Sequence, residues 1–147
     1  MFQKLIRTEN SYSALILRVV LGIVIFPHGA QKALGWFGGG GLGNTMQFFA
    51  QMQIPAIFGA LDIVAEFLGA LGLIVGLLGR VAAFGIGCVM VVAVYRVHLP
   101  NGFFMNWSGR QPGEGFEYHL LVLAIVIALL IKGSGALSLD RVLMRRR

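Results

Sequence analysis

Four apolar stretches, each close to the length needed to cross a lipid bilayer, account for most of this chain of 147 residues. A transmembrane helix needs about 20 consecutive apolar residues, and we expect spans at about 13–33, 56–78, 81–97 and 116–132. Only 12% of the residues are charged, whereas a soluble domain carries about a quarter. The sequence therefore predicts an all-α integral membrane protein, a four-helix bundle that forms a single domain over residues 1–147.

Two long loops are expected to lie at one membrane surface. The interfacial loops 34–55 and 98–115 contain aromatic residues of the kind that gather where a span meets the lipid headgroups. Within the first loop, residues 45–52 have an amphipathic pattern suited to a helix that lies in the headgroup zone. Between the second and third spans, Gly79 and Arg80 leave room only for a tight turn, which makes those two spans antiparallel neighbours.

The basic residues indicate the orientation. Lys and Arg are enriched on the cytoplasmic side of membrane proteins, and one side of the predicted bundle carries more of them. We therefore expect both termini in the cytoplasm and the two long loops on the outer side. The basic residues near the span ends are Lys4, Arg7, Arg80, Arg141, Arg145, Arg146 and Arg147 on the first side, against Lys32, Arg96 and Arg110 on the second.

Charge and cysteine content exclude two classes of function. The net charge of +6 would favour nucleic-acid binding in a soluble protein. Here the basic residues lie mostly at helix ends, where they suit membrane lipid as a partner and not nucleic acid. The chain has one cysteine, Cys88, so it can form neither an intramolecular disulfide nor a Cys-x-x-Cys redox pair.

Ionisable residues inside the spans are the candidates for function, since each is costly at membrane depth unless it is paired or hydrated. On the first span, Arg18, His28 and Lys32 share a face with Gly22 and Gly29. Because glycines let two helix backbones approach closely, we expect this face to point into the bundle.

The second span carries two carboxylates one turn apart. Asp62 and Glu66 share a face with Gly59 and Gly69, so both are expected inside a helix interface. Glu66 lies about ten residues into the span, near the middle of the bilayer at a rise of about 1.5 Å per residue. Of the charged residues in the spans, Glu66 is the one whose side chain is least able to reach the membrane surface.

The third span ends and the fourth begins with further ionisable residues. His98 follows the third span, and Glu117 and His119 open the fourth. Glu117 is on one helical stripe with Ala124 and Ala128, so we expect it to point inward. His119 faces nearly the opposite way and is the weaker candidate.

These residues support two interpretations. In the first, a polar pocket open to the outer side binds a small molecule or relays protons, with His28 and Glu66 as proton-exchanging, catalytic groups. In the second, the basic residues of the first span neutralise the carboxylates of the second, Arg96 pairs with Glu117, and the charges only hold the bundle together. The ligand-binding candidates of the first interpretation are Gln31, Lys32, His98, Glu117, Arg18 and Asp62.

The cofactor is left open by the residues. No His-Glu-x-x-His or other metal-binding spacing occurs, so we predict no metal site. Haem is compatible with a four-helix bundle, with His28 and His98 as candidate axial ligands. A quinone is the other candidate, because some of the aromatic residues at the outer surface could stack on a flat ring.

Several short motifs follow one another along the chain. They are Arg18-x-x-x-Gly22, Pro27-His28-Gly29-Ala30-Gln31-Lys32, Gly35, Phe37-Gly38-Gly39, Glu66, Gly76, Arg80, His98, Gly102-Phe103-Phe104, Gly115-Phe116-Glu117 and Gly133-Ser134-Gly135-Ala136-Leu137-Ser138-Leu139-Asp140. In this order they resemble the DoxX family of small bacterial and archaeal membrane proteins. The resemblance implies a multi-pass protein of the cell (inner) membrane. It also implies a link to quinone-linked respiratory oxidoreductases, from a component of which the family takes its name.

The resemblance gives a first hypothesis about function. Family members are mostly labelled oxidoreductases, but this chain has no flavin, nicotinamide, cysteine-pair or iron–sulfur signature. A redox role therefore needs a bound quinone, haem or metal, or a partner subunit. We expect an accessory subunit of a quinone-linked membrane oxidoreductase, in which Gln31 and Lys32 donate hydrogen bonds to the ligand, with a redox partner subunit or a homodimer as the assembly.

Two alternatives use the same residues. The chain could be a transport or export component for a small metabolite, metal or modified peptide, with the polar cluster as its substrate site. It could also be a structural partner of another membrane protein, without a ligand of its own. The residues alone fit an enzyme and a non-catalytic subunit equally.

Overall fold

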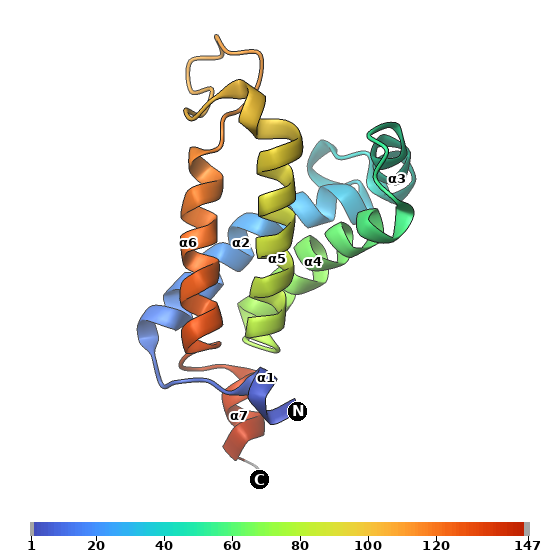
Figure 1. Cartoon of the computed structure of the whole chain (residues 1–147). Coiled ribbons are helices and arrows are strands. Elements are labelled where there is room, and N and C mark those ends of the chain that lie inside the picture. Colours follow the sequence, from blue (N-terminus) through green and yellow to red (C-terminus); the bar gives the residue numbers. More distant parts are fainter. Residues whose placement is uncertain (1, 146–147) are drawn as a thin grey trace.

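The computed structural model describes residues 2–145, which are mostly helical and contain no strand (Figure 1). Arg146 and Arg147, counted above among the basic residues, lie outside the described residues. The elements in chain order are α1 (Phe2–Ile6), α2 (Tyr12–Leu34), η1 (Trp36–Gly38), α3 (Gly41–Gln51), α4 (Ala56–Val75), α5 (Gly79–Ala93), η2 (Val94–His98), η3 (Leu99–Asn101), α6 (Glu117–Lys132) and α7 (Leu139–Arg145).

Within residues 2–145, three helices are long and apolar enough to cross a membrane. They are α2, α4 and the continuous helical segment Gly79–Asn101, which combines α5, η2 and η3. The fourth apolar helix, α6, has 16 residues, which is about 24 Å of helix against a hydrocarbon core of about 30 Å. The chain is therefore a membrane protein with several apolar helices, of which α6 is markedly short.

The predicted span limits are close except at the turn between the second and third spans. The second span was expected to reach residue 78, but α4 ends at Val75 because Gly76 adopts a left-handed conformation (φ 73°) that stops the helix. The turn is formed by residues 76–78, and Gly79 and Arg80, expected in the turn, already belong to α5. In α2, Pro27 lies inside the helix without ending it.

The four apolar helices contact one another in a closed order. The most extensive packing is between α2 and α4, followed by α4 with α5, α5 with α6, and α6 with α2. In Figure 1, α5 and α6 run nearly side by side, and α2 and α4 cross them at an incline. Helices α4 and α5 meet through small residues, since a Cβ on Gly69 would contact Ala82 and one on Gly85 would contact Ala65.

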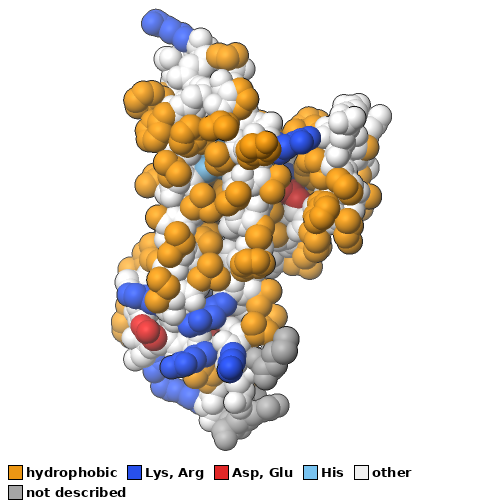
Figure 2. Space-filling view, in the orientation of Figure 1, with side chains coloured by type: hydrophobic (Ala, Val, Ile, Leu, Met, Phe, Trp, Pro, Cys, Tyr) orange, Lys and Arg blue, Asp and Glu red, His pale blue; other side chains and the backbone are white. Residues whose placement is uncertain are grey.

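Apolar and basic side chains occupy different parts of the surface. Apolar side chains cover most of the visible face, and Lys and Arg gather toward the end that carries both termini (Figure 2). The interior contains a cluster of buried apolar residues from all four apolar helices, among them Leu21, Leu73, Ile86 and Val126. An apolar outside and an apolar core are what a lipid-embedded bundle requires.

Candidate functional site

Buried polar residues form two separate groups. We call the first the terminal network: Arg18, Ser134, Ser138 and Asp140, which are 1–2% exposed and lie at the end that carries the termini. The second, the polar cluster, lies in the other half of the molecule and consists of Lys32, Asp62, Glu66, His98, Tyr118 and His119.

Arg18 does not pair with the carboxylates of the second span, as one interpretation of the sequence expected. Its guanidinium donates five hydrogen bonds to main-chain oxygens, and an arginine has five N–H donors. Two acceptors, Leu73 O and Ile74 O, are carbonyls of the last turn of α4, where the regular helical hydrogen bonds end. The others are carbonyls of Ser134, Ala136 and Leu137. Arg18 is therefore fully used in joining α2 to α4 and to the segment before α7.

Asp140 completes the terminal network. Its carboxylate accepts hydrogen bonds from the backbone N–H groups of Leu78 and Gly79 and from the hydroxyl of Ser134, at 2.8, 3.1 and 2.5 Å. Its own N–H donates to Gly76 O. A Cβ on Gly76 would come within 2.5 Å of Ser138 Cβ, so this glycine is needed both for its φ of 73° and for close approach. The last motif of the family resemblance, residues 133–140, thus binds the turn between α4 and α5 and holds it in place.

The polar cluster begins with an ion triad. Lys32 Nζ lies 2.6 Å from Asp62 Oδ2 and 2.8 Å from Glu66 Oε2. Glu66 is 4% exposed, and Asp62 and Lys32 are half-buried. The expected pairing of Lys32 with both carboxylates is confirmed, and an isolated charge at this depth would be far more costly than a paired one.

Close helix packing makes this triad possible. A Cβ on Gly29 would come within 2.5 Å of the main chain at Glu66 and Phe67, so α2 and α4 touch backbone to backbone there. Lys32 lies one turn further along α2 and reaches back over the same contact. Helix α3 covers the triad from outside through Phe49, whose ring centroid is 5.7 Å from Lys32 Nζ.

Helix α6 supplies the other half of the cluster, from a face that the sequence interpretation assigned wrongly. The buried stripe is His119, Val122, Val126 and Leu129, whereas Ala124 is exposed. His119, rated the weaker candidate, is 6% exposed and inside the bundle. These residues recur at helical spacing from His119. The periodicity of the bulky residues therefore predicts the buried face of α6 correctly, whereas the positions of the alanines do not.

His98 and His119 lie ring against ring. Their centroids are 4.1 Å apart, and His119 also contacts the ring of Tyr118 edge-on at 5.4 Å. His98 Nδ1 is 2.8 Å from the carbonyl oxygen of Glu114, so Nδ1 carries the proton and Nε2 is left with the lone pair. Tyr118 and Glu66 are near enough to interact electrostatically, which joins the α6 side chains to the ion triad.

Three buried polar atoms of this cluster lack a hydrogen-bond partner within the described part of the chain: Glu66 Oε2, the hydroxyl of Tyr118 and Nδ1 of His119. Glu66 Oε2 still forms the ion pair with Lys32, whereas the atoms of Tyr118 and His119 have no polar partner among the described residues. Buried polar groups are nearly always hydrogen-bonded, and each exception calls for a reason such as a bound molecule or a functional role. The terminal network shows that this fold can satisfy such groups fully, so the contrast identifies the polar cluster as the candidate site.

The remaining predicted site residues have other surroundings. His28 is exposed, within electrostatic range of His119. Gln31 donates from Nε2 to Phe37 O in the following loop. Glu117, expected to point inward, instead accepts from Met105 N and Trp107 Nε1 and so fixes the loop before α6.

The expected pair of Arg96 with Glu117 is wrong. Arg96 donates from Nη2 to Met52 O at 2.6 Å, which ties the end of the third span to the loop after α3. The charges of the outer loops therefore hold the loops in place and do not neutralise one another.

Cofactors can be tested against this geometry. Within residues 2–145, no group of three or more His, Cys, Asp or Glu is arranged to hold a metal ion. For haem, the His98 ring faces another imidazole at 4.1 Å, which leaves no space for a porphyrin on that face. A single carbonyl or hydroxyl oxygen of a small organic ligand fits the donors better, because Tyr118 has an O–H group with nothing to donate to.

Comparisons with known proteins point to one family. The sequence pattern that defines the DoxX family matches residues 13–99. The chain is 31% identical to "Putative oxidoreductase CatD" of Bacillus subtilis, over 86% of this chain and 83% of that protein. It is 28% identical to "Inner membrane protein YqjF" of Escherichia coli (90% and 92%) and 31% identical to "Uncharacterized membrane protein Rv3486" of Mycobacterium tuberculosis (97% and 88%). No solved structure matches.

Proposed function

The chain belongs to the DoxX family, and we propose that it is an accessory subunit of a membrane redox system whose polar cluster binds a quinone-like headgroup and exchanges protons with it. The observation that carries the proposal is a pair of buried polar atoms without a partner among the described residues: the hydroxyl of Tyr118, which lies within electrostatic range of Glu66, and Nδ1 of His119. One relative is named an oxidoreductase and another an inner membrane protein, which supports a redox role at that membrane.

The cluster contains the groups that this chemistry requires. A quinone is reduced to a quinol by two electrons and two protons, and the electrons come from the partner subunit of the redox system. Tyr118 donates its O–H to a carbonyl oxygen of the headgroup, and His119 carries a proton within the same site. Glu66 accepts or supplies protons, because its carboxyl is 4% exposed and shares its one cation, Lys32, with Asp62.

The same proposal includes the membrane arrangement. Four spans, α2, α4, the segment Gly79–Asn101 and α6, place both termini on the cytoplasmic side and the polar cluster in the outer half of the inner membrane. The gathering of Lys and Arg toward the end that carries the termini supports this orientation (Figure 2). A reporter fused to the C-terminus is expected to signal from the cytoplasm, and a periplasmic signal would reverse the assignment.

The experiment compares quinone binding between matched charge-removing variants. The full chain is purified in mild detergent from its own membranes, extracted for quinone, and titrated with decylubiquinone or menadione, with tryptophan fluorescence as the readout. We expect co-purified quinone in the wild type and an affinity about tenfold lower in Glu66→Gln, which removes a charged partner of the site. Glu9→Gln is the control, since Glu9 is exposed at the other end of the molecule.

Three results would contradict the proposal. The first is a wild-type protein that contains no quinone and binds neither probe. The second is an equal loss of affinity in Glu66→Gln and Glu9→Gln. The third is a collapse of the folded yield of Glu66→Gln, which would mean that the ion triad only holds the bundle together; a normal yield is expected because glutamine keeps the shape and an oxygen for Lys32.

A further inference from the structure

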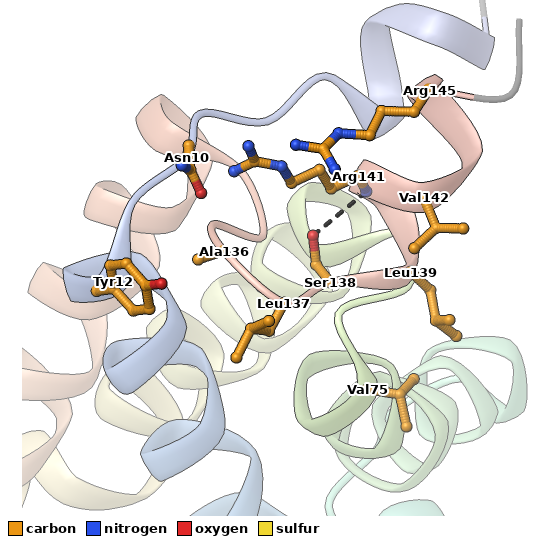
Figure 3. Close-up of a pocket in the computed structure, with 10 residues that line it drawn as sticks. All are labelled: Asn10, Tyr12, Val75, Ala136, Leu137, Ser138, Leu139, Arg141, Val142 and Arg145. Carbon is orange, nitrogen blue, oxygen red and sulfur yellow. Dashed lines mark hydrogen bonds between the residues drawn. The ribbon is translucent and has the colours of Figure 1, made fainter.

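A pocket lies away from the polar cluster, at the end that carries the termini. It has a volume of about 470 Å³, within the range of small-molecule sites. One side is formed by Arg141 and Arg145 of α7 together with Asn10, and the other by apolar residues at the ends of the helices. The apolar side chains are Val75, Leu137, Leu139 and Val142 (Figure 3).

Among the described residues, the basic side of this pocket forms no ion pair. Arg141 and Arg145 are one turn apart on α7, so they project from the same face. Figure 3 shows both side chains reaching across the pocket toward the segment that carries Asn10. Neither guanidinium forms an ion pair or hydrogen bond with another side chain among residues 3–145, and Nη1 of Arg141 is buried without a partner there. Two like charges held together in this way favour an anion.

The apolar side of the pocket lies at the end of an apolar helix. Val75 is the last residue of α4, so the pocket begins where a membrane-spanning helix ends. Leu137 is 77% exposed and is held at a φ of 48°, an unfavourable conformation for leucine. Arg18 fixes that conformation by donating to Leu137 O, so the fold maintains an apolar side chain at the rim of a basic pocket.

We infer that this pocket is a binding site for an anionic phospholipid of the leaflet at the termini side. The phosphate lies against the guanidinium groups of Arg141 and Arg145, and an acyl chain runs along Leu137, Leu139 and Val75. A basic pocket at the level of the headgroups, continuous with an apolar wall below, matches this ligand in both charge and polarity. A free anion would bind the two arginines but would make no favourable contact with the apolar side of the pocket. This site is independent of the proposed quinone site.

The test measures lipid binding by the delipidated full chain in detergent. Native mass spectrometry and thermal unfolding are recorded with phosphatidylglycerol, phosphatidylcholine, and glycerol phosphate or inorganic phosphate. We expect tighter binding of phosphatidylglycerol than of the other three. We also expect about tenfold weaker binding of it for Arg141→Gln and a further loss for Arg141→Gln with Arg145→Gln, since each removes a charge-assisted contact.

Two further variants separate this site from general attraction of a basic surface. Lys4→Gln with Arg7→Gln removes the same charge from exposed residues at the same end that do not line the pocket, and binding is expected to stay within about twofold of wild type, because exposed charges are screened by salt. Leu137→Gly relieves the backbone at that position and removes the apolar rim, so it is expected to weaken lipid binding but not phosphate binding.

Each other outcome overturns the inference. Equal affinity for phosphatidylcholine would exclude a role for the charge. Equal losses in the two double variants would reduce the effect to surface electrostatics. Inorganic phosphate that binds as tightly as the lipid, or a Leu137→Gly variant that binds lipid normally, would make the pocket an anion site without a lipid chain.

Discussion

The terminal network and the polar cluster are both buried, both charged and both built around α2 and α4, yet they differ in how their hydrogen bonds are completed. In the terminal network, Arg18 uses all five of its N–H donors and Asp140 accepts three hydrogen bonds. In the polar cluster, Tyr118 and His119 hold polar atoms that bond to nothing else within residues 2–145.

The difference separates structure from function in one molecule. A buried polar group that is fully satisfied stabilises one arrangement of the chain, whereas an unsatisfied one lowers stability and persists where something else requires it. Both groups contain residues of the DoxX-like motifs, so membership in the pattern does not by itself identify a catalytic role. Removing a satisfied group of the terminal network and removing the unsatisfied hydroxyl of Tyr118 should therefore change stability in opposite directions.

The largest effect is expected for Arg18→Met. Methionine fills similar space but leaves five carbonyl oxygens without their donor, at a cost of about 3 kcal/mol or more. We expect little folded protein after purification, measured by size-exclusion chromatography and thermal unfolding in detergent. Arg7→Met, at an exposed position of the same end, is the control and should unfold as the wild type does. A stable Arg18→Met protein would show that the hydrogen bonds of Arg18 are not needed to hold the fold together.

A smaller loss is expected for Asp140→Asn. The amide keeps one acceptor oxygen but turns an NH₂ group toward donors that the carboxylate now accepts, from Leu78, Gly79 and Ser134. The expected cost is about 2 kcal/mol, seen as a lower midpoint of thermal unfolding. An unchanged midpoint would mean that the hydrogen bonds of Asp140 to the α4–α5 turn add nothing to the stability of the fold, and that Arg18 alone stabilises this end of the molecule.

The smallest effect, and the one with the opposite sign, is expected for Tyr118→Phe. The change removes an unsatisfied buried hydroxyl, so stability should stay the same or rise by up to about 1 kcal/mol. Decylubiquinone binding should weaken at the same time, because the donor to its carbonyl is lost. Tyr95→Phe, at an exposed position of the third span, should change neither quantity. A drop in stability for Tyr118→Phe would show that the hydroxyl is bonded in the folded protein.

Much of the architecture could be predicted from hydropathy and small residues. The limits of the helices α2 and α6 and the contact of α2 with α4 through Gly29 follow from local pattern, since helix length and helical faces depend on residues close in sequence. The pairing of Lys32 with Asp62 and Glu66 followed from the same faces, because paired charges must meet inside the bundle.

The role of Arg18 and the face of α6 could not be predicted in the same way. The acceptors of Arg18 are main-chain carbonyls 55 to 119 residues away, and any residue type can supply a carbonyl. On α6, small residues were taken to mark the helix interface, but the interface there is formed by bulky Val122, Val126 and Leu129. Small residues indicate contact only where backbones touch, as at Gly29, and not where side chains interdigitate.

The shortness of α6 has a consequence for access to the site. A helix of 16 residues falls short of the surrounding hydrocarbon, so the bilayer thins or the headgroups descend beside it. Its first turn carries Tyr118 and His119, and the water boundary therefore dips toward these residues on the α6 side. In the proposed function, a proton that enters beside α6 would therefore cross less hydrocarbon on its way to Glu66 than the depth of Glu66 along α4 alone would require.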